Sequence, residues 1–427
     1  MLKTEVFWQS TLANPATSGP AALPERVDVA VIGGGYTGLS AARSLAQRGA
    51  NVAVLEAETM GWGASSRNGG MVLTGLKISM QSAFKRYGTE LARRLFRFSL
   101  DGITEVEQLV RQEGIDCGFA RNGHLLLANK PAQYAALTQE AEFMAAHFGH
   151  KLQLVPRASQ RNEVGSDVYF GGLVDELSAG LNPAQYVGGL ARAAERAGAH
   201  LYPQTRVVRL ERGRGGFIVE TARGKLAAGQ VLVATSGYTG HATPSLRRKI
   251  IPIGSFIIAT ERLRDDVVRT LNPHQRMIFD YKHYLHYYRI WDQRLIFGGR
   301  AAFFPENSST IRQSAEILRQ DMLDVFPQLK DALVEYAWGG TLDFAFDTMP
   351  HVGETEGMWY ALGYAGHGVA MATHLGSTAA SAMLAGGIKD HPLHEIPFPS
   401  VPLGLYSGWP WFLPFVGVWY RILDLLE

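Results

Sequence analysis

The sequence predicts a mixed α/β fold, in which a Rossmann-like dinucleotide-binding domain is joined to a second domain built on an antiparallel sheet. Residues 27–56 have the pattern of a strand, a glycine-rich turn, a helix and a second strand. Strand-like segments recur between 206 and 300, and another strand, glycine-rich turn and helix follow between 358 and 384. A chain of 427 residues suits two or three domains better than one.

The turn after the first strand carries Gly33, Gly35 and Gly38 in G-x-G-x-x-G spacing. The first glycine permits the tight turn, the second lets a pyrophosphate approach the backbone, and the third lets the helix pack closely on the strands. The helix N-terminus offers free N–H groups and a positive dipole end. Glu56 lies 18 residues after Gly38, where a carboxylate can bind both ribose hydroxyls. The segment predicts a dinucleotide site, disfavours NADP, and leaves FAD and NAD open.

The composition narrows the class of protein. Apolar residues make up 46% of the chain and charged residues 19%, as in a globular protein with a large core. The net charge of +2 gives no support to a nucleic-acid partner. The single cysteine, Cys117, excludes an intrachain disulfide and a thiolate metal cluster, and no metal site is predicted. Because neither a signal peptide nor a run of 18 apolar residues is evident, we expect a cytoplasmic protein.

The loop at 57–70 is rich in glycine and serine, and its backbone amides make it a candidate second contact for the cofactor phosphates. Arg67 and Asn68 are candidate cofactor contacts within it, and a plain surface loop is the alternative. Elsewhere, the apolar pattern predicts helices at 80–113, 131–148, 182–197 and 311–329, a strand hairpin at 118–129, and strands at 167–179, 206–211, 217–221 and 231–234.

Residues 281–300 form a predicted aromatic hairpin with its turn at 291–294. Alternation places His286 and Tyr288 on one face, and Tyr287 and Trp291 on the other. One face should be core, and the other could line a pocket in which aromatic rings hold a cationic amine. Ordinary cross-strand aromatic packing is the alternative.

The C-terminal part repeats the anion-binding pattern and then becomes apolar. A buried strand at 358–362, a glycine-rich turn at 363–368 and a small-residue helix at 369–384 predict a second helix N-terminus suited to anions. From Phe415 onward, apolar residues form one helical stripe. This helix either docks on its own protein or lies in a membrane interface.

Four segments carry a family resemblance: VIGGGYTGLSAA at 31–42, LEAETMGWGASSRNGG at 55–70, RLIFGGR with WGGTLDF within 294–344, and ALGYAGHGVAMA at 361–372. With them the sequence resembles the D-amino-acid-oxidase-type FAD-dependent oxidoreductases, and is most similar to their bacterial gamma-glutamylputrescine oxidoreductase branch. The resemblance implies FAD rather than NAD. It also implies a discontinuous FAD-binding domain (1–85, 180–245 and 338–427) and a substrate domain (86–179 and 246–337).

The resemblance further implies which residues bind FAD, from the glycine turn, the acidic strand end, the 65–70 loop, the adenine side and the second glycine-rich turn. These residues are Gly33, Gly35, Tyr36, Thr37, Gly38, Glu56, Ala57, Ser65, Ser66, Arg67, Asn68, Gly69, Gly70, Val207, Ala234, Thr235, Gly339, Gly363, Gly366, His367, Gly368 and Val369.

Three departures from the family pattern shape the expectations. Relatives that bind flavin covalently use a histidine or cysteine at positions that correspond here to Arg67 and Tyr336, so noncovalent FAD is expected. A lysine that promotes reaction with oxygen corresponds to Ile296, and a lysine that helps bind a substrate carboxylate corresponds to Ala370. Both differences argue against a fast oxidase and a simple α-amino-acid substrate.

The predicted activity is oxidation of the C–N bond of a small-molecule amine or N-substituted amino acid by hydride transfer to flavin N5. The imine then hydrolyses, and oxygen is the acceptor. An aromatic, poorly hydrated pocket would lower the pKa of the amine. The predicted catalytic residues are His367, Tyr288, Trp338 and His286. The alternatives are a dehydrogenase that passes electrons to quinone or a carrier protein, with peripheral contact at the inner membrane face, and a non-catalytic flavin-binding subunit.

Overall fold

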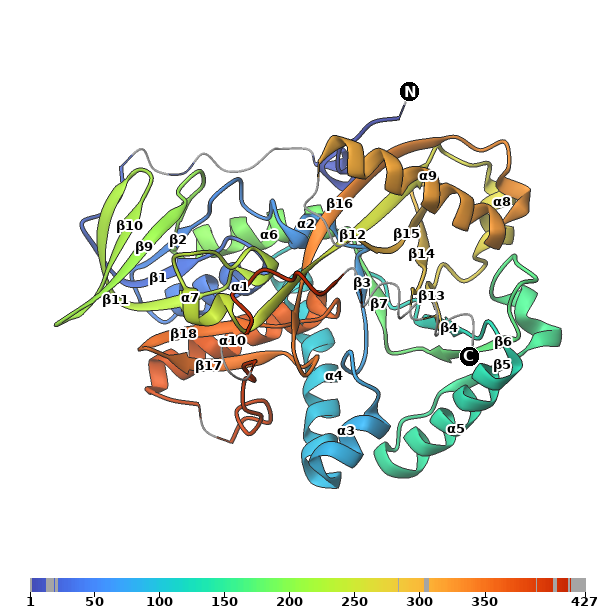
Figure 1. Cartoon of the computed structure of the whole chain (residues 1–427), viewed down its shortest axis with the longest axis horizontal. Helices are drawn as coiled ribbons and strands as arrows, with labels where there is room; N and C mark the ends of the chain where they lie inside the picture. Colours follow the sequence, from blue (N-terminus) through green and yellow to red (C-terminus); the bar gives the residue numbers. More distant parts are fainter. Residues whose placement is uncertain are drawn as a thin grey trace.

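The computed structural model describes residues 2–12, 19, 22–282, 284–302, 307–388, 390–401, 405–413 and 415. Two sheets lie side by side along the long axis of the molecule, with helices α4 (Thr89–Gln112) and α3 (Met80–Tyr87) beside the junction (Figure 1). The predicted C-terminal helix lies almost wholly at 416–427, outside the described residues. In the described part, no helix is both long and apolar enough to span a membrane.

The first sheet contains the predicted nucleotide-binding unit. Its strands follow the order β17 (His351–Thr355), β18 (Met358–Leu362), β11 (Gly224–Val233), β1 (Arg26–Ile32), β2 (Val52–Leu55) and β8 (His200–Tyr202). The central strand β1 pairs in parallel with β11 and β2. The ribbon of β9 (Val207–Gly213) and β10 (Gly216–Thr221) extends antiparallel from β11. The predicted strand–helix–strand unit at 27–56 is therefore confirmed.

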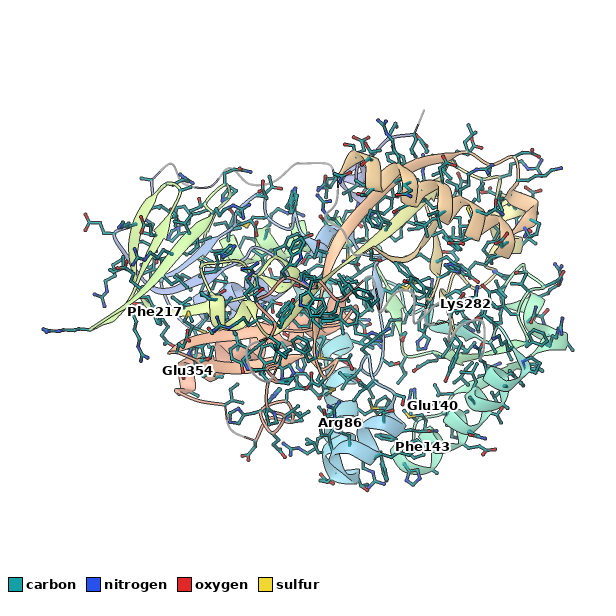
Figure 2. The ribbon with its side chains drawn as sticks, in the orientation of Figure 1. Arg86, Glu140, Phe143, Phe217, Lys282 and Glu354 are labelled. Carbon is teal, nitrogen blue, oxygen red and sulfur yellow. The ribbon has the colours of Figure 1, made fainter. Side chains whose placement is uncertain are left out.

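One hydrophobic core joins the helices next to this sheet: α1 (Tyr36–Ala46), α4, α6 (Pro183–Arg196) and α10 (Gly368–Ala385). The predicted helix at 80–113 is divided into α3 and α4 at Gly88, whose φ of 81° ends a helix. Helix α3 meets α5 (Pro131–Phe148) through Phe84 and Phe143, whose ring centroids are 5.4 Å apart with an interplanar angle of 82°. Figure 2 labels Phe143 and Arg86 at this lower edge of the molecule.

The second sheet has the order β16 (Val334–Ala345), β12 (Ile250–Thr260), β15 (Arg294–Ala302), β14 (Tyr287–Trp291), β13 (Met277–Asp280), β4 (His124–Leu127), β6 (Gly171–Asp175) and β5 (Gln153–Pro156). Its pairs are antiparallel except β4 with β13. The predicted hairpin at 118–129 is wrong, because its only strand, β4, pairs with β13 and β6. The predicted hairpin turn is confirmed between β14 and β15, where Asp292 and Gln293 have φ of 49° and 59°.

The remaining elements are short, apart from helix α9 on the second sheet. They are α2 (Ala64–Arg67), α7 (Pro244–Arg247), α8 (Asp265–Leu271), α9 (Ser308–Val325), β3 (Met71–Val72), β7 (Ala179–Gly180), and the 3₁₀ turns η1 (Phe7–Thr11), η2 (Arg157–Asn162), η3 (Ser236–Tyr238) and η4 (Pro327–Leu329).

The two faces of the second sheet have different neighbours. Tyr288, Phe297, Ile258 and Ala337 lie opposite one another across four strands and share a core with α9. Tyr288 is 1% exposed, and its hydroxyl donates to the Tyr169 hydroxyl at 3.0 Å. The assignment of Tyr288 to a substrate pocket is therefore corrected: its face is the one that α9 covers.

His286 also lies on the α9 face, and its assignment to the pocket is corrected for the same reason. Its ring nitrogens lie 3.2 Å from an Asp280 carboxylate oxygen and 3.3 Å from an Asp321 carboxylate oxygen on α9. Burial alone would lower the pKa of His286, but hydrogen bonding to Asp280 and Asp321 outweighs it and raises the pKa to about 9. The imidazolium thus joins the β13–β14 connection to α9.

This arrangement predicts a pH-dependent stability. Because the folded-state pKa of His286 lies above its unfolded value, its contribution is fully present below pH ~6.5 and is lost as the pH rises through about 9. We expect His286→Gln to lower the free energy of unfolding at pH 6 by on the order of 2–3 kcal/mol, and by less at pH 9.5. Urea unfolding at both pH values measures this. The exposed His274, as His274→Gln, is the control, and an equal effect of His286→Gln at both pH values would contradict the assignment.

Candidate active site

A cavity of about 460 Å³ opens where β1, β2 and β11 of the first sheet end. Residues that directly follow these strands line it, including Gly33, Glu56 and Ala234. Ligands of open α/β sheets bind at this carboxyl edge. Of the residues predicted to bind the cofactor, those that line the cavity are Gly33, Gly35, Tyr36, Thr37, Glu56, Ala57, Ser65, Asn68, Val207, Ala234, Thr235, Gly366, Gly368 and Val369.

The glycine turn has no room for side chains. A Cβ on Gly33 would lie 2.5 Å from the Ala234 carbonyl oxygen, and its φ of 109° favours glycine. A Cβ on Gly35 would lie 2.8 Å from Ser65 Oγ. A Cβ on Gly38 would lie 1.9 Å from the Gly33 carbonyl oxygen, so Gly38 supports the turn by close helix packing. The cavity therefore exposes backbone N–H groups at the start of α1.

The Glu56 carboxylate is fixed at the end of β2 by backbone donors. It accepts hydrogen bonds from Gly34 N at 2.7 Å and Glu58 N at 2.9 Å. Burial raises the pKa of the carboxyl, and these amides oppose the rise. Each carboxylate oxygen has a further lone pair, so the group retains acceptor capacity for ribose hydroxyls.

A second helix N-terminus reaches the same cavity. Helix α10 begins at Gly368 with His367 as its N-cap, and Gly366, Gly368 and Val369 line the cavity. Neither N-cap residue caps its helix through its side chain. In α1 the first N–H, that of Tyr36, donates to Ser65 Oγ at 3.0 Å, so the N–H groups that follow it in the first turn are the ones left for a ligand. Two positive helix ends at one cavity suit an anionic ligand.

Asp343, at the end of β16, organises the turn before α10, and sequence analysis gave it no role. Its carboxylate accepts from Gly363 N at 2.6 Å and Tyr364 N at 3.2 Å. Burial raises its pKa to about 6 against these hydrogen bonds. The Tyr364 hydroxyl lies 2.6 Å from Thr37 Oγ1, which ties this turn to α1. The signal was present, since Asp343 lies in the quoted WGGTLDF segment and Tyr364 in ALGYAGHGVAMA.

Other cavity residues were also missed. Trp62, Ser236, Tyr238 and Thr243 line the cavity with Asp343 and Tyr364. Trp62 and Tyr238 form an edge-to-face pair with centroids 5.6 Å apart. Trp62 lies within the predicted 57–70 loop, whereas Tyr238 follows the predicted strand after 229, and neither has a local feature that indicates a ligand.

Several predicted cofactor residues lie behind the cavity lining. The Arg67 side chain does not line the cavity. Its Nε donates to the Trp62 carbonyl at 2.8 Å and its Nη1 to the Gly339 carbonyl at 3.1 Å. Its guanidinium also lies over the Trp62 ring, 4.3 Å from the centroid. The other predicted residues that do not line the cavity are Gly38, Ser66, Gly69, Gly70, Gly339, Gly363 and His367.

Of the predicted catalytic residues, Trp338 on β16 lies on the face of the second sheet that is turned away from α9. Tyr287, Gly298, Ile257 and Trp338 are directly opposite one another across four strands, so they share this face. Gly298 provides space for a ring, since a Cβ there would lie 2.4 Å from the Tyr287 ring. The Tyr287 hydroxyl lies 3.1 Å from Ser255 Oγ. Tyr287 therefore occupies the face that sequence analysis assigned to Tyr288.

His367 is partly buried at the start of α10. Burial lowers its pKa to about 3, and the nearby charges of Lys77 and His124 lower it further. The imidazole is therefore neutral at neutral pH and can accept a hydrogen bond. The pKa of His124 is also lowered, mainly by burial, and its Nδ1 lies 2.8 Å from Ser178 Oγ. In the described part of the chain, no group of His, Cys, Asp or Glu is arranged to hold a metal ion.

The donor set fits FAD. The glycine cradle, the two uncapped helix N-termini and the buried acid at the end of β2 provide amides for phosphates and a carboxylate for a ribose. The family model of FAD-dependent oxidoreductases matches residues 28–382. The chain therefore belongs to the FAD-dependent oxidoreductase family, and it is a flavoenzyme.

Two curated relatives match most of the chain. It is 34% identical to a probable oxidoreductase OrdL of Haemophilus influenzae over 384 residues, covering 88% of this chain and 87% of the relative. It is 33% identical to the gamma-glutamylputrescine oxidoreductase of Escherichia coli over 379 residues, covering 87% of this chain and 88% of the relative.

Solved structures share the fold at lower identity. Glycine oxidase from Geobacillus kaustophilus superposes with a TM-score of 0.74 at 22% identity, covering 89% of this chain and 99% of that chain. L-proline dehydrogenase from P. horikoshii superposes with a TM-score of 0.70 at 21% identity, covering 92% and 99%. The predicted fold class, a Rossmann-like domain with a second antiparallel sheet, is confirmed.

The role of Asp343 leads to a prediction. Asp343→Ala should leave the N–H groups of Gly363 and Tyr364 without their acceptor, and a buried unpaired donor costs about 1–3 kcal/mol. We expect the free energy of unfolding to fall by about that amount and the protein to retain less FAD. Chemical denaturation and the ratio of flavin to protein absorbance measure the two effects. The exposed Asp331, as Asp331→Ala, is the control, and equal behaviour of the two variants would contradict the role of Asp343.

Proposed function

We propose that this flavoenzyme oxidises the C–N bond of a small amine or N-substituted amino acid, and that the imine product then hydrolyses. The observation that carries the proposal is the neutral, desolvated His367 at the start of α10, beside the FAD cavity. The similarity of this chain, over most of its length, to a gamma-glutamylputrescine oxidoreductase supports an amine substrate. The bound flavin supplies the hydride acceptor at N5.

The chain's own residues favour an uncharged amine at this place. Lys77 lies close enough to His367 to lower its pKa, and the same positive charge disfavours a protonated amine nearby. The neutral imidazole of His367 is an acceptor for an amine N–H. On the adjoining sheet face, Phe279 and Tyr287 lie opposite one another and offer aromatic surface to the substrate. We infer that Tyr287, with Trp338 behind it, replaces Tyr288 as the aromatic pocket residue.

We propose that FAD is held without a covalent bond. Arg67 stands in the loop where some relatives carry a linking histidine, and its guanidinium is engaged by backbone carbonyls. Cys117 is buried in the core of α1, α4 and α6, and burial raises its thiol pKa to about 12.

We further propose the division into an FAD-binding domain (1–85, 180–245 and 338–427) and a substrate domain (86–179 and 246–337). Two segments contact the other domain: α4 packs in the core of the first sheet, and residues 338–345 belong to the second sheet.

Oxygen is the proposed electron acceptor. A second candidate, transfer to quinone or a carrier protein, is favoured by Ile296. This residue is 1% exposed and lies in an apolar cluster with Trp8, Tyr336 and Trp338, and its own side chain carries no positive charge. An apolar environment gives no electrostatic stabilisation to a reduced oxygen species.

Anaerobic mixing with amines tests the activity. We expect gamma-glutamylputrescine, an N-methyl amino acid or a simple polyamine to bleach the flavin absorbance of the purified protein. Admission of air should restore the colour with release of peroxide if oxygen is the acceptor. Recovery only after addition of a quinone would instead assign the dehydrogenase. If no amine bleaches the flavin, the proposed function is wrong.

The role of His367 is tested by substitution. His367→Ala should slow flavin reduction by the reactive amine by about 100-fold, because it removes the neutral acceptor for the amine N–H. The pH profile of reduction should show no titration of His367 above pH ~5, since its pKa is about 3. Stopped-flow reduction rates measure both, with the exposed His394, as His394→Ala, for comparison. Equal rates for His367→Ala and the unsubstituted protein would remove His367 from the reaction.

We also propose a cytoplasmic location with peripheral membrane contact through the C-terminal tail. Trp409 and Trp411 are 59% and 60% exposed, whereas Leu413 and Tyr406 of the same tail pack on Ile251. Exposed tryptophans prefer the membrane interface. We expect the protein to sediment with anionic lipid vesicles, and Trp409→Ser with Trp411→Ser to reduce the bound fraction severalfold. Absence of sedimentation would assign the tail to the protein surface alone.

A further inference from the structure

The N-terminal arm at 2–12 crosses from one sheet to the other. Lys3 extends the edge strand β16, with its N–H donating to the Glu335 carbonyl at 2.8 Å and its carbonyl accepting from Ala337 N at 2.9 Å. At the other end, Asn182 Nδ2 donates to Thr11 Oγ1 at 2.8 Å, just before α6. Both ends of the arm are thus fixed, and Trp8 lies between them.

Trp8 reaches the loop that borders the FAD cavity. Its side chain is 0% exposed, and its indole Nε1 donates to the Asn68 carbonyl at 2.8 Å. Trp338 of β16 binds the residue before Asn68, since its indole Nε1 donates to the Arg67 carbonyl at 2.9 Å. The two indoles meet edge to face, 6.5 Å apart at 77°. Consecutive carbonyls of one loop are therefore held by two tryptophans that are 330 positions apart in the sequence, one on the arm and one on the sheet.

A third donor continues this pattern along the loop. Arg289 is buried, and its Nη1 donates to the Gly70 carbonyl at 2.9 Å and the Leu181 carbonyl at 3.0 Å. Asn68 closes the loop on itself, because its Oδ1 accepts from Gly70 N at 2.7 Å. Three carbonyls within four residues are thus fixed from the side of the second sheet.

The opposite side of the loop borders the cavity. In a planar trans peptide the N–H points away from the carbonyl oxygen. Indoles that hold the carbonyls of Arg67 and Asn68 consequently direct the N–H groups of Asn68 and Gly69 away from the second sheet. Asn68 and Ser65 of the same loop line the FAD cavity. Fixed donors require no reorganisation when an anionic or electron-rich group binds.

We propose that Trp8 and Trp338 are positioning residues for FAD, which hold the 64–70 loop so that its backbone donors face the cofactor. The N-terminal arm is then part of the cofactor site, although it does not line the cavity. This inference depends on FAD binding and not on the identity of the substrate, so its test is separate from that of the proposed amine oxidation.

Conservative substitutions test the proposal on the holoenzyme. Trp8→Phe and Trp338→Phe remove an indole N–H and retain an aromatic ring. We expect each to accelerate FAD release by about 5- to 30-fold, measured as the rise of flavin fluorescence after dilution. The visible circular dichroism and the midpoint potential of the bound flavin should shift as well, since the loop donors that face the cavity are displaced.

Trp291→Phe is the matched control. Trp291 packs edge to face on Trp8 with centroids 5.7 Å apart, so its substitution perturbs the same cluster without removing a bond to the loop. Release of FAD from Trp8→Phe at the rate of Trp291→Phe, with unchanged dichroism, would overturn the proposal. If Trp8→Phe does not fold, the comparison of Trp338→Phe with Trp291→Phe decides by the same criterion.

Discussion

The close approach of α1 and α10 is the constraint on which the cofactor site depends. Gly376 of α10 lies against α1, where a Cβ would be 2.4 Å from the Thr37 carbonyl oxygen. Ser40 Oγ donates to the Thr373 carbonyl at 2.7 Å across the same interface. Small residues at these positions bring both helix N-termini to one cavity, so that their dipoles and uncapped N–H groups act on the same ligand. A bulky side chain at this interface would separate the two helix ends.

The 64–70 loop connects the cofactor cavity to the second sheet. One side of the loop lines the cavity, and the other meets the face of the sheet that carries Tyr287 and Trp338. A Cβ on Gly69 would lie 3.3 Å from the Tyr287 ring, so the loop and the aromatic face are in contact. The residues that support the cofactor and the residues that we propose to border the substrate therefore share one packed interface, and neither group is positioned independently.

The sequence predicted features that depend on local pattern. The unit β1–α1–β2, helix α5 and helix α6 follow from apolar periodicity and turn residues over at most about 30 consecutive residues. The choice between Tyr287 and Tyr288 does not follow, because alternation defines two faces without saying which one a distant helix covers. The orientation of Arg67 depends in the same way on the Gly339 carbonyl, 272 positions along the chain. Trp8 was missed because its partner is a backbone carbonyl, which carries no sequence signature. Asp343 lies within a segment that carries the family resemblance, but the backbone N–H groups that it binds cannot be read from that segment.

The two faces of β14 have different neighbours, so their side chains meet different structural requirements. Tyr288 and Ile290 pack under α9, where a change in volume costs stability, whereas Tyr287 on the alternate position borders the cofactor loop. Neighbouring residues in one strand thus meet different requirements, one for the stability of the core and one for the cofactor loop. A substitution at Tyr287 can therefore change the surface beside the cofactor loop and leave the core under α9 intact. One five-residue strand thus separates the requirements of the fold from those of the site.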